Sequence, residues 1–203
     1  GTGAQTVGAS AVFTAYTSLT ISNTTGGAVS ANTNFGVTGT FTVNAGAVFS
    51  PAAAVQINSA APAGTISGSG TVRVTRVVNT TDFSLQYRFT TYTLTSLTVE
   101  YVGTIAQQVD GNATITSYGH LKINNLPNTA TLAAATTVNG SLTVTSGSTL
   151  STGATATLGV EGNLKVDGVL NGAAGNITLS GAAMTIDGIG SIATSSTGNL
   201  TIS

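Results

Sequence analysis

The sequence is poor in the residue types on which most protein chemistry depends. Its 203 residues include no cysteine, no tryptophan, one histidine and one methionine, and only 5% are charged, against roughly 25% in soluble domains. Without cysteine there is no disulfide framework, thiolate metal ligand or cysteine nucleophile. Five Lys and Arg residues against six Asp and Glu give a net charge of -1. No basic patch therefore predicts a nucleic-acid partner.

Long apolar runs are missing as well. No stretch approaches 18 consecutive apolar residues, so we expect no membrane-spanning helix. The chain starts at Gly1 with neither an initiator methionine nor a signal peptide, which indicates a processed or excised piece. The low charge, the lack of cysteine and six Asn-x-Ser/Thr sequons favour an extracellular or cell-surface location. No cofactor is predicted.

Glycine and small polar or apolar residues make up most of what remains. The 26 glycines and the 41% hydrophobic content differ from the polar, highly charged composition of disordered chains. No segment shows a 3.6-residue apolar stripe, so helix is expected to be nearly absent. The composition therefore predicts an all-β protein.

The chain contains a long internal repeat. The phrase Gly1-Thr2-x-Ala4-Gln5-x-Val7 returns in the middle of the chain as Gly103-Thr104-x-Ala106-Gln107-x-Val109. At the same offset Tyr16, Leu19, Ile21 and Asn23 return as Tyr118, Leu121, Ile123 and Asn125. Such repeats indicate stacked units. The sequence therefore predicts a first unit at 1–102 and a second at 103–203, in one continuous structure.

A shorter period runs through both units. Apolar residues at i and i+2, separated by a polar residue, occur at 121–123, 142–144, 164–166, 184–186 and 200–202, in nearly equal steps except for the last, which is shorter. This alternation is typical of half-buried strands. A parallel β-solenoid (β-helix) with about 20–22 residues per turn, its turns stacked one on another, is the fold that this period predicts. The alternative fold is a pair of tandem β-sandwich domains.

Residues 71–102 differ from the rest because they carry three of the five basic residues and three of the five tyrosines. Longer strands are expected there. The segment is a possible binding face for sugar or for another subunit, and its residues would be Arg73, Arg76, Tyr87, Arg88 and Tyr92. The alternative is a wider turn or a protruding hairpin, with the arginines paired to Asp82 and Glu100.

Few residues are candidates for a metal-binding or catalytic site. Asp167 and Asp187 follow similar strand phrases one turn apart, so they are expected to stack about 5 Å apart. With Asn124 and Thr145 in the same column they are a weak candidate for a cation site. A single histidine, His120, cannot form a zinc site alone, and we expect its side chain to point outward. No catalytic residue is predicted, and the protein is not expected to be an enzyme.

Several phrases resemble a known family. They are Gly68-Ser-Gly70-Thr-Val-Arg-Val-Thr-Arg76, Leu97-Thr-Val-Glu-Tyr101, Gly103-Thr-x-Ala-Gln107-x-Val109, Leu121-Lys-Ile-Asn-Asn125 and Thr137-Val-Asn-Gly-Ser-Leu-Thr-Val144. The chain resembles the tandem repeats of bacterial cell-surface adhesin-type proteins, including filamentous-haemagglutinin-like β-helical repeats. The resemblance covers essentially the whole chain. It implies an extracellular structural or adhesive role and transfers no catalytic residue.

An uncapped solenoid exposes strand edges that recruit further chains. We therefore expect a structural subunit of an extracellular bacterial filament or surface fibre, in which copies assemble head to tail. The predicted interface residues are Gly1, Thr2, Ala4, Gln5, Val7, Leu200, Thr201 and Ile202. The alternatives are a fragment of a long adhesin that binds glycan or a host or biofilm matrix, a β-helical polysaccharide-cleaving enzyme, and an ice-binding protein with outward Thr-x-Thr rows.

Overall fold

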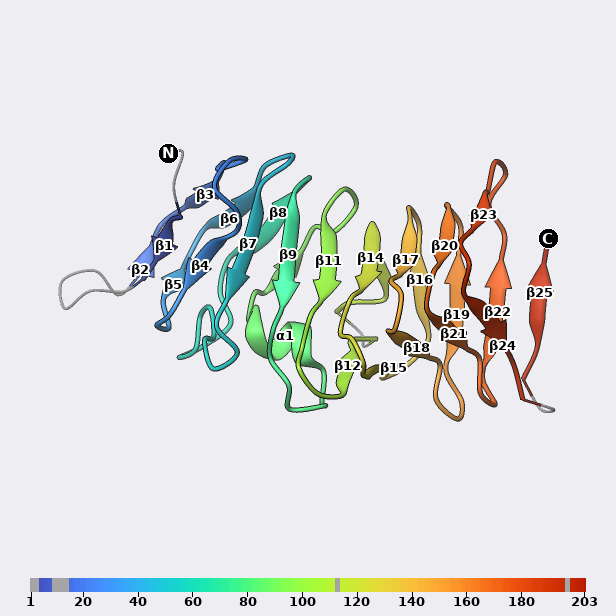
Figure 1. Cartoon of the computed structure of the whole chain (residues 1–203). Coiled ribbons are helices and arrows are strands. Elements are labelled where there is room, and N and C mark those ends of the chain that lie inside the picture. The colour runs from blue at the N-terminus through green and yellow to red at the C-terminus, as the bar shows by residue number, and fades with distance from the viewer. Residues whose placement is uncertain (1–3, 9–14, 112–113, 196–197) are drawn as a thin grey trace.

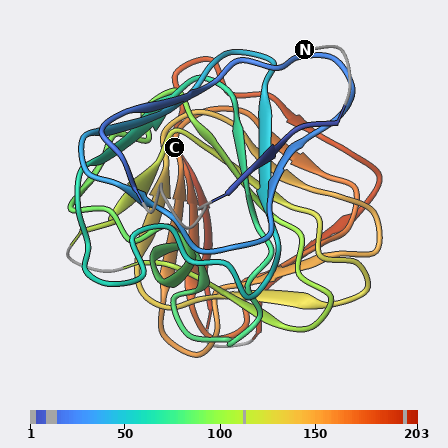
Figure 2. The same ribbon diagram turned by 90° about the vertical axis from the view of Figure 1, so that its left-hand side faces the viewer.

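The structure is a computed structural model that describes residues 4–8, 15–111, 114–195 and 198–203. All strand pairings among these residues are parallel. The strands stack as a β-solenoid of about eight turns with about 22 residues per turn, seen from the side in Figure 1 and from its N-terminal end in Figure 2. The predicted parallel solenoid is confirmed, and the alternative of tandem sandwiches is wrong.

Each turn adds one strand to a nine-stranded sheet, which we call the long sheet. In spatial order its strands are β1 (Thr6–Val7), β4 (Val29–Ala31), β7 (Val48–Pro51), β9 (Thr71–Val74), β11 (Thr98–Tyr101), β14 (His120–Ile123), β17 (Leu142–Val144), β20 (Leu164–Val166) and β23 (Ile186–Asp187). Leu121 pairs with Leu142, and Leu142 pairs with Leu164. These turns therefore have the spacing that the sequence predicts.

After each long-sheet strand the chain passes over a second and then a third face. The second face holds β2 (Ala15–Tyr16), β5 (Gly36–Val37), β12 (Gln107–Val109), β15 (Thr129–Leu132), β18 (Thr149–Ser151), β21 (Val169–Asn171) and β24 (Ser191–Ala193). The third face holds β3 (Leu19–Ile21), β6 (Thr40–Val43), β8 (Thr65–Gly68), β10 (Thr91–Tyr92), β13 (Ser117–Tyr118), β16 (Thr136–Val138), β19 (Thr157–Val160), β22 (Asn176–Leu179) and β25 (Leu200–Ile202).

The core consists of columns, which we define as residues at matching register in successive turns. In the long sheet, Val72, Val99, Leu121, Leu142 and Leu164 form one inward column and are all buried. The residue between two inward positions points outward and is polar in most of these strands, because successive side chains of a strand alternate between the two faces. Apolar stacking inside and the backbone ladder between turns therefore hold the same strands together.

The turn that starts at Thr71 is wider than the others. Thr71 pairs with Thr98, and this step along the chain is longer than that between any other neighbours in the long sheet. The turn contains α1 (Asp82–Gln86), the only helix among the described residues, which lies on the second face beside β12. The predicted wider turn is confirmed. The prediction of longer strands in this segment is wrong. Strands β9 and β11 have four residues each, as many as β6, β7 and β14, and residues 82–86 are helical.

Two of the predicted strand phrases lie at other registers than expected. Ile186, and not Met184, stands opposite Leu164, so this step equals the one between Leu142 and Leu164. Leu200 pairs with Ile177 on the third face instead of continuing the long sheet, which explains why the last step in the sequence is short. A shift of two residues keeps the inward–outward alternation, so the pattern of apolar residues does not reveal it.

The repeated sequences occupy different faces of the solenoid. Leu19 and Ile21 lie in β3 on the third face, whereas Leu121 and Ile123 lie in β14 of the long sheet. The long sheet runs without interruption across residue 102, where the first unit is predicted to end. The position of that boundary stays a prediction. None of the described helical structure has the length and apolarity of a membrane-spanning helix.

Candidate assembly interface

The last turn exposes apolar side chains at positions whose partners in the preceding turn are buried. Ile186 is 49% exposed, Leu200 43% and Ile202 67%. They continue inward columns, because their partners one turn earlier are Leu164, Ile177 and Leu179, each at most 1% exposed. The strands that carry them, β23 and β25, are the edge strands of their sheets. This turn therefore presents apolar columns and unpaired backbone groups along the axis of the solenoid.

The first turn is open in the same way. Strand β1 is the other edge of the long sheet, and Ala4 and Gln5 before it are exposed. Gln5 precedes the pair Thr6–Ser30 in register, so it heads the inward column that continues with Val29 and Phe49. The predicted interface residues Gly1 and Thr2 lie outside the described residues, while Val7 is half-buried and Leu200, Thr201 and Ile202 are exposed.

The two ends match in phase as well as in chemistry. The described chain enters the solenoid on the long sheet with β1 and leaves it on the third face with β25. The strand that follows a third-face strand in every earlier turn belongs to the long sheet. A copy placed on β23, β24 and β25 would therefore offer β1, β2 and β3 in the correct order.

The segment predicted as a binding face is largely engaged within the chain. Tyr87 is fully buried, and its hydroxyl donates to the Arg73 carbonyl at 2.7 Å. Burial raises the pKa of Tyr87 well above its ordinary value. The Tyr92 hydroxyl donates to the Tyr87 carbonyl at 2.7 Å, and Arg88 Nη1 donates to the Ser59 carbonyl. The prediction that Tyr87 faces a ligand is wrong, because its ring packs among the aromatic residues of the core.

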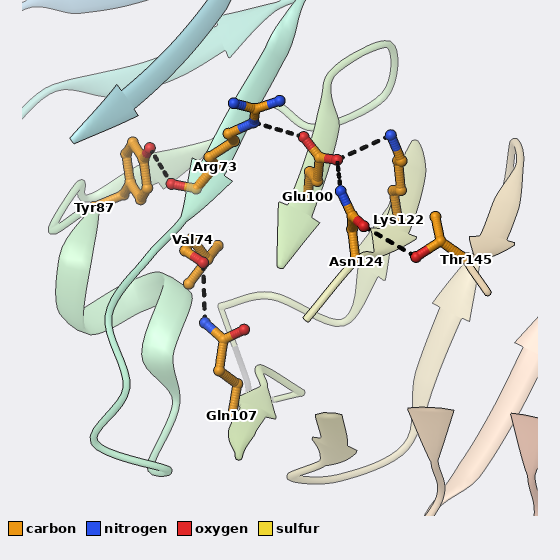
Figure 3. A network of polar contacts seen from close by, with 8 residues as sticks. All are labelled: Arg73, Val74, Tyr87, Glu100, Gln107, Lys122, Asn124 and Thr145. Atoms are coloured by element: carbon orange, nitrogen blue, oxygen red, sulfur yellow. Dashed lines mark hydrogen bonds and ion pairs between the residues drawn. The ribbon is translucent and has the colours of Figure 1, made fainter. Parts of the chain in front are cut away.

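Glu100 is the centre of a polar network on the outward side of the long sheet (Figure 3). Its carboxylate is buried and lies 2.8 Å from Arg73 Nε and 2.9 Å from Lys122 Nζ. It also accepts a hydrogen bond from Asn124 Nδ2 at 3.0 Å. Burial acts to raise the pKa of Glu100, but the hydrogen bonds from these three residues outweigh it and leave the pKa below its ordinary value. The predicted pairing of an arginine with Glu100 is thus confirmed, between directly opposed residues of β9 and β11.

The two aspartates of the weak cation-site prediction do not stack. Asp187 stands opposite Lys165, because β23 is displaced by two residues from the register assumed for it. Asp167 instead forms an ion pair of 3.1 Å with Lys165. The described residues contain no group of three His, Cys, Asp or Glu placed to hold a metal ion. His120 is half-buried, and its Nδ1 accepts the Ser141 backbone N–H at 3.0 Å.

A second buried acid, Asp110, holds the start of α1 from the next turn. Its carboxylate accepts the backbone N–H groups of Phe83 at 2.9 Å and Ser84 at 3.2 Å, which the helix itself leaves unpaired. Burial raises the pKa of Asp110 to about 6 against the opposing effect of these hydrogen bonds. A second contact runs in the opposite direction: the carboxylate of Asp82, in the helix, accepts the Gln108 backbone N–H at 2.8 Å. The sequence gives no signal for this role of Asp110, because no local pattern links it to a helix in the preceding turn.

No protein-family model matches the chain, and comparison with curated proteins and with solved structures gives no significant match. The resemblance to adhesin-type repeats therefore stays an expectation, and the geometry of the two open ends is the basis for a functional proposal.

Proposed function

We propose that this chain is a structural subunit of an extracellular bacterial filament or surface fibre, which lengthens as copies stack end to end. One observation carries the proposal: Ile186, Leu200 and Ile202 extend columns that are buried in the preceding turn, yet they are exposed themselves. Burying a Leu or Ile side chain stabilises a contact by about 1.5–3 kcal/mol. A further turn of the same solenoid would cover all three.

A second copy is the partner that fits these ends. Continuing the columns of the long sheet across the joint places Gln5, Thr6 and Val7 of the added copy beside Ile186, Asp187 and Gly188. The added strand would be parallel, as in every pairing inside the described chain. A head-to-tail contact of this kind leaves both outer ends free and so produces an open filament rather than a closed ring.

Disulfide cross-linking tests this register, because the chain has no cysteine of its own. In the variant Thr6→Cys/Asp187→Cys the two positions lie at opposite edges of the nine-stranded sheet, so no bond can form within one chain. Across the proposed joint their Cα atoms would be about 4.8 Å apart, inside the disulfide range of about 4.4–6.8 Å. Oxidation should therefore produce a ladder of covalent oligomers on a non-reducing gel.

The matched control is Thr6→Cys/Lys165→Cys, because Lys165 lies in the same outward column one strand farther from the end. Its distance to Thr6 of the next copy would be about 10 Å, and we expect little cross-linking. Negative-stain micrographs of the unmodified protein should show filaments that dissolve to the single chain in denaturant. Discrete monomers at high concentration, or equal cross-linking of the two variants, would overturn the proposal.

A further inference from the structure

The side chain of Gln107 forms hydrogen bonds that connect its own turn to the preceding turn. Its side chain is completely buried, and its Nε2 donates to the carbonyls of Val74 at 2.9 Å and Arg76 at 2.8 Å, the first of which Figure 3 shows. Its Oε1 accepts the Gly103 N–H at 2.7 Å. Because this buried amide directs its hydrogen bonds at backbone groups, the side chain acts as a clamp between the turns of β9 and β12.

The clamp stands at the head of an apolar column. On the second face Gln107 is followed at the same register by Ala130, Leu150 and Leu170, all buried. An amide in place of an aliphatic side chain is costly to bury unless it is hydrogen-bonded. Gln107 meets this condition because the chain carbonyls of the preceding turn are within its reach.

Gln5 corresponds to Gln107 in two respects: it has the same place in the repeated phrase, and it also stands at the head of an inward column. It is the residue equivalent to Gln107 in the first copy of that phrase, and it heads the inward column of Val29, Phe49 and Val72 in the long sheet. Its backbone carbonyl accepts the Ser30 N–H at 2.9 Å. Unlike that of Gln107, its side chain is exposed, at the edge where a preceding copy would dock.

We infer that Gln5 is the clamp of the subunit joint, an inference that rests on the proposed end-to-end assembly. Its amide donates to backbone carbonyls in the last turn of the preceding copy, as Gln107 donates to Val74 and Arg76. Some carbonyls of the last turn, such as those of Thr185 and Asn199, already accept hydrogen bonds from the turn before. Those that point away from it lie on the free edges of β23 and β25, and they need an external donor. The partner surface is therefore recognised by its backbone, and Gln5 specifies which end of the preceding copy is bound.

Gln5→Leu separates this inference from apolar stacking alone. Leucine has a similar size and matches the apolar residues of the column, so stacking alone predicts unchanged or stronger assembly. The clamp predicts the opposite, because two hydrogen bonds are lost and the carbonyls stay unpaired. We expect the critical concentration for filament formation, measured by sedimentation, to rise roughly tenfold.

Thr155→Leu is the control, since Thr155 is exposed on the side of the solenoid and far from either end; it should leave the critical concentration unchanged. Equal denaturation midpoints of the three proteins will show that the fold is intact. If the unmodified chain forms no filaments, the proposed function fails and the clamp with it. If filaments form and Gln5→Leu assembles as readily as the unmodified chain, the clamp alone is wrong.

Discussion

Different side chains fill the part of the solenoid up to β13 and the part from β14 onward, which we call its first and second halves. All six phenylalanines and all five tyrosines of the sequence lie between residues 13 and 118. The ring of Phe49 contacts three others, those of Phe35, Phe41 and Tyr87, at centroid distances of 5.1–6.2 Å. The second half stacks Leu, Ile and Val. The steps between long-sheet strands vary widely among the first turns, whereas those of the later turns are nearly constant.

The difference shows what makes a solenoid regular. Aliphatic side chains of similar size, such as Leu158 above Ile177, stack at the strand spacing without changing the path of the chain, so each turn has nearly the same length. Large rings interlock at angles, such as the 88° between Phe35 and Phe49, and each turn must adjust to its neighbours. The first half is therefore a conventional packed core, and the second half is a repeating ladder.

Truncation of one buried residue in each half should show this difference most strongly. Phe49→Ala removes a ring that contacts three others, and we expect a loss of about 3–5 kcal/mol in the free energy of unfolding. Leu142→Ala in the ladder should cost about 2–3 kcal/mol, since the lost contacts are mainly those with its column neighbours Leu121 and Leu164. Denaturant titration measures both values. A larger loss for Leu142→Ala would contradict the proposed division.

The first half also contains the groups that should set the pH dependence of stability. The pKa of Asp110 is raised to about 6 in the folded protein, so the folded state binds this proton more tightly than the unfolded state. Its contribution to stability should therefore increase as the pH falls from about 7 towards 4, by up to roughly 3 kcal/mol. The lowered pKa of Glu100 has the opposite sign, and its contribution is lost at still lower pH.

Unfolding titrations between pH 3 and 8 measure this profile, which should have its maximum near pH 5. Asp110→Asn should remove most of the rise in stability between pH 7 and 5. It should also lower stability at every pH, because Asn keeps only one acceptor oxygen and its NH2 group would face one of the two helix N–H donors. An unchanged pH profile in this variant would show that another group is responsible.

A comparison of ion pairs should give the smallest differences. Glu100 lies in the first half of the solenoid, and Glu100→Gln removes the charge that Arg73 and Lys122 share. We expect a loss of about 1.5–3 kcal/mol in the free energy of unfolding. Asp167→Asn removes the partner of Lys165 in the second half, where both side chains are partly exposed, and should cost less than about 1 kcal/mol. Unfolding at low and high salt measures both; the effect of Asp167→Asn should disappear in high salt, and that of Glu100→Gln should persist.

The candidate interface is partly predictable from the sequence. The exposed Leu200 and Ile202 are expected at the end, because their alternation matches that of strands in the preceding turns. Ile186 is not, since the phrase around Met184 suggests a register two residues away. The role of Gln107 is also hidden, because its carbonyl partners precede it by 31 and 33 residues.

Residue order alone encodes the strand period, the inward and outward sides and the parallel stacking, because each depends on a pattern that recurs once per turn. It does not encode which face a strand joins, the register of β23 or the short helix held by Asp110. A two-residue shift leaves the alternation intact, and α1 depends on a carboxylate from another turn. These features emerge only when the turns pack, since contacts between distant segments then select one of several locally equivalent arrangements.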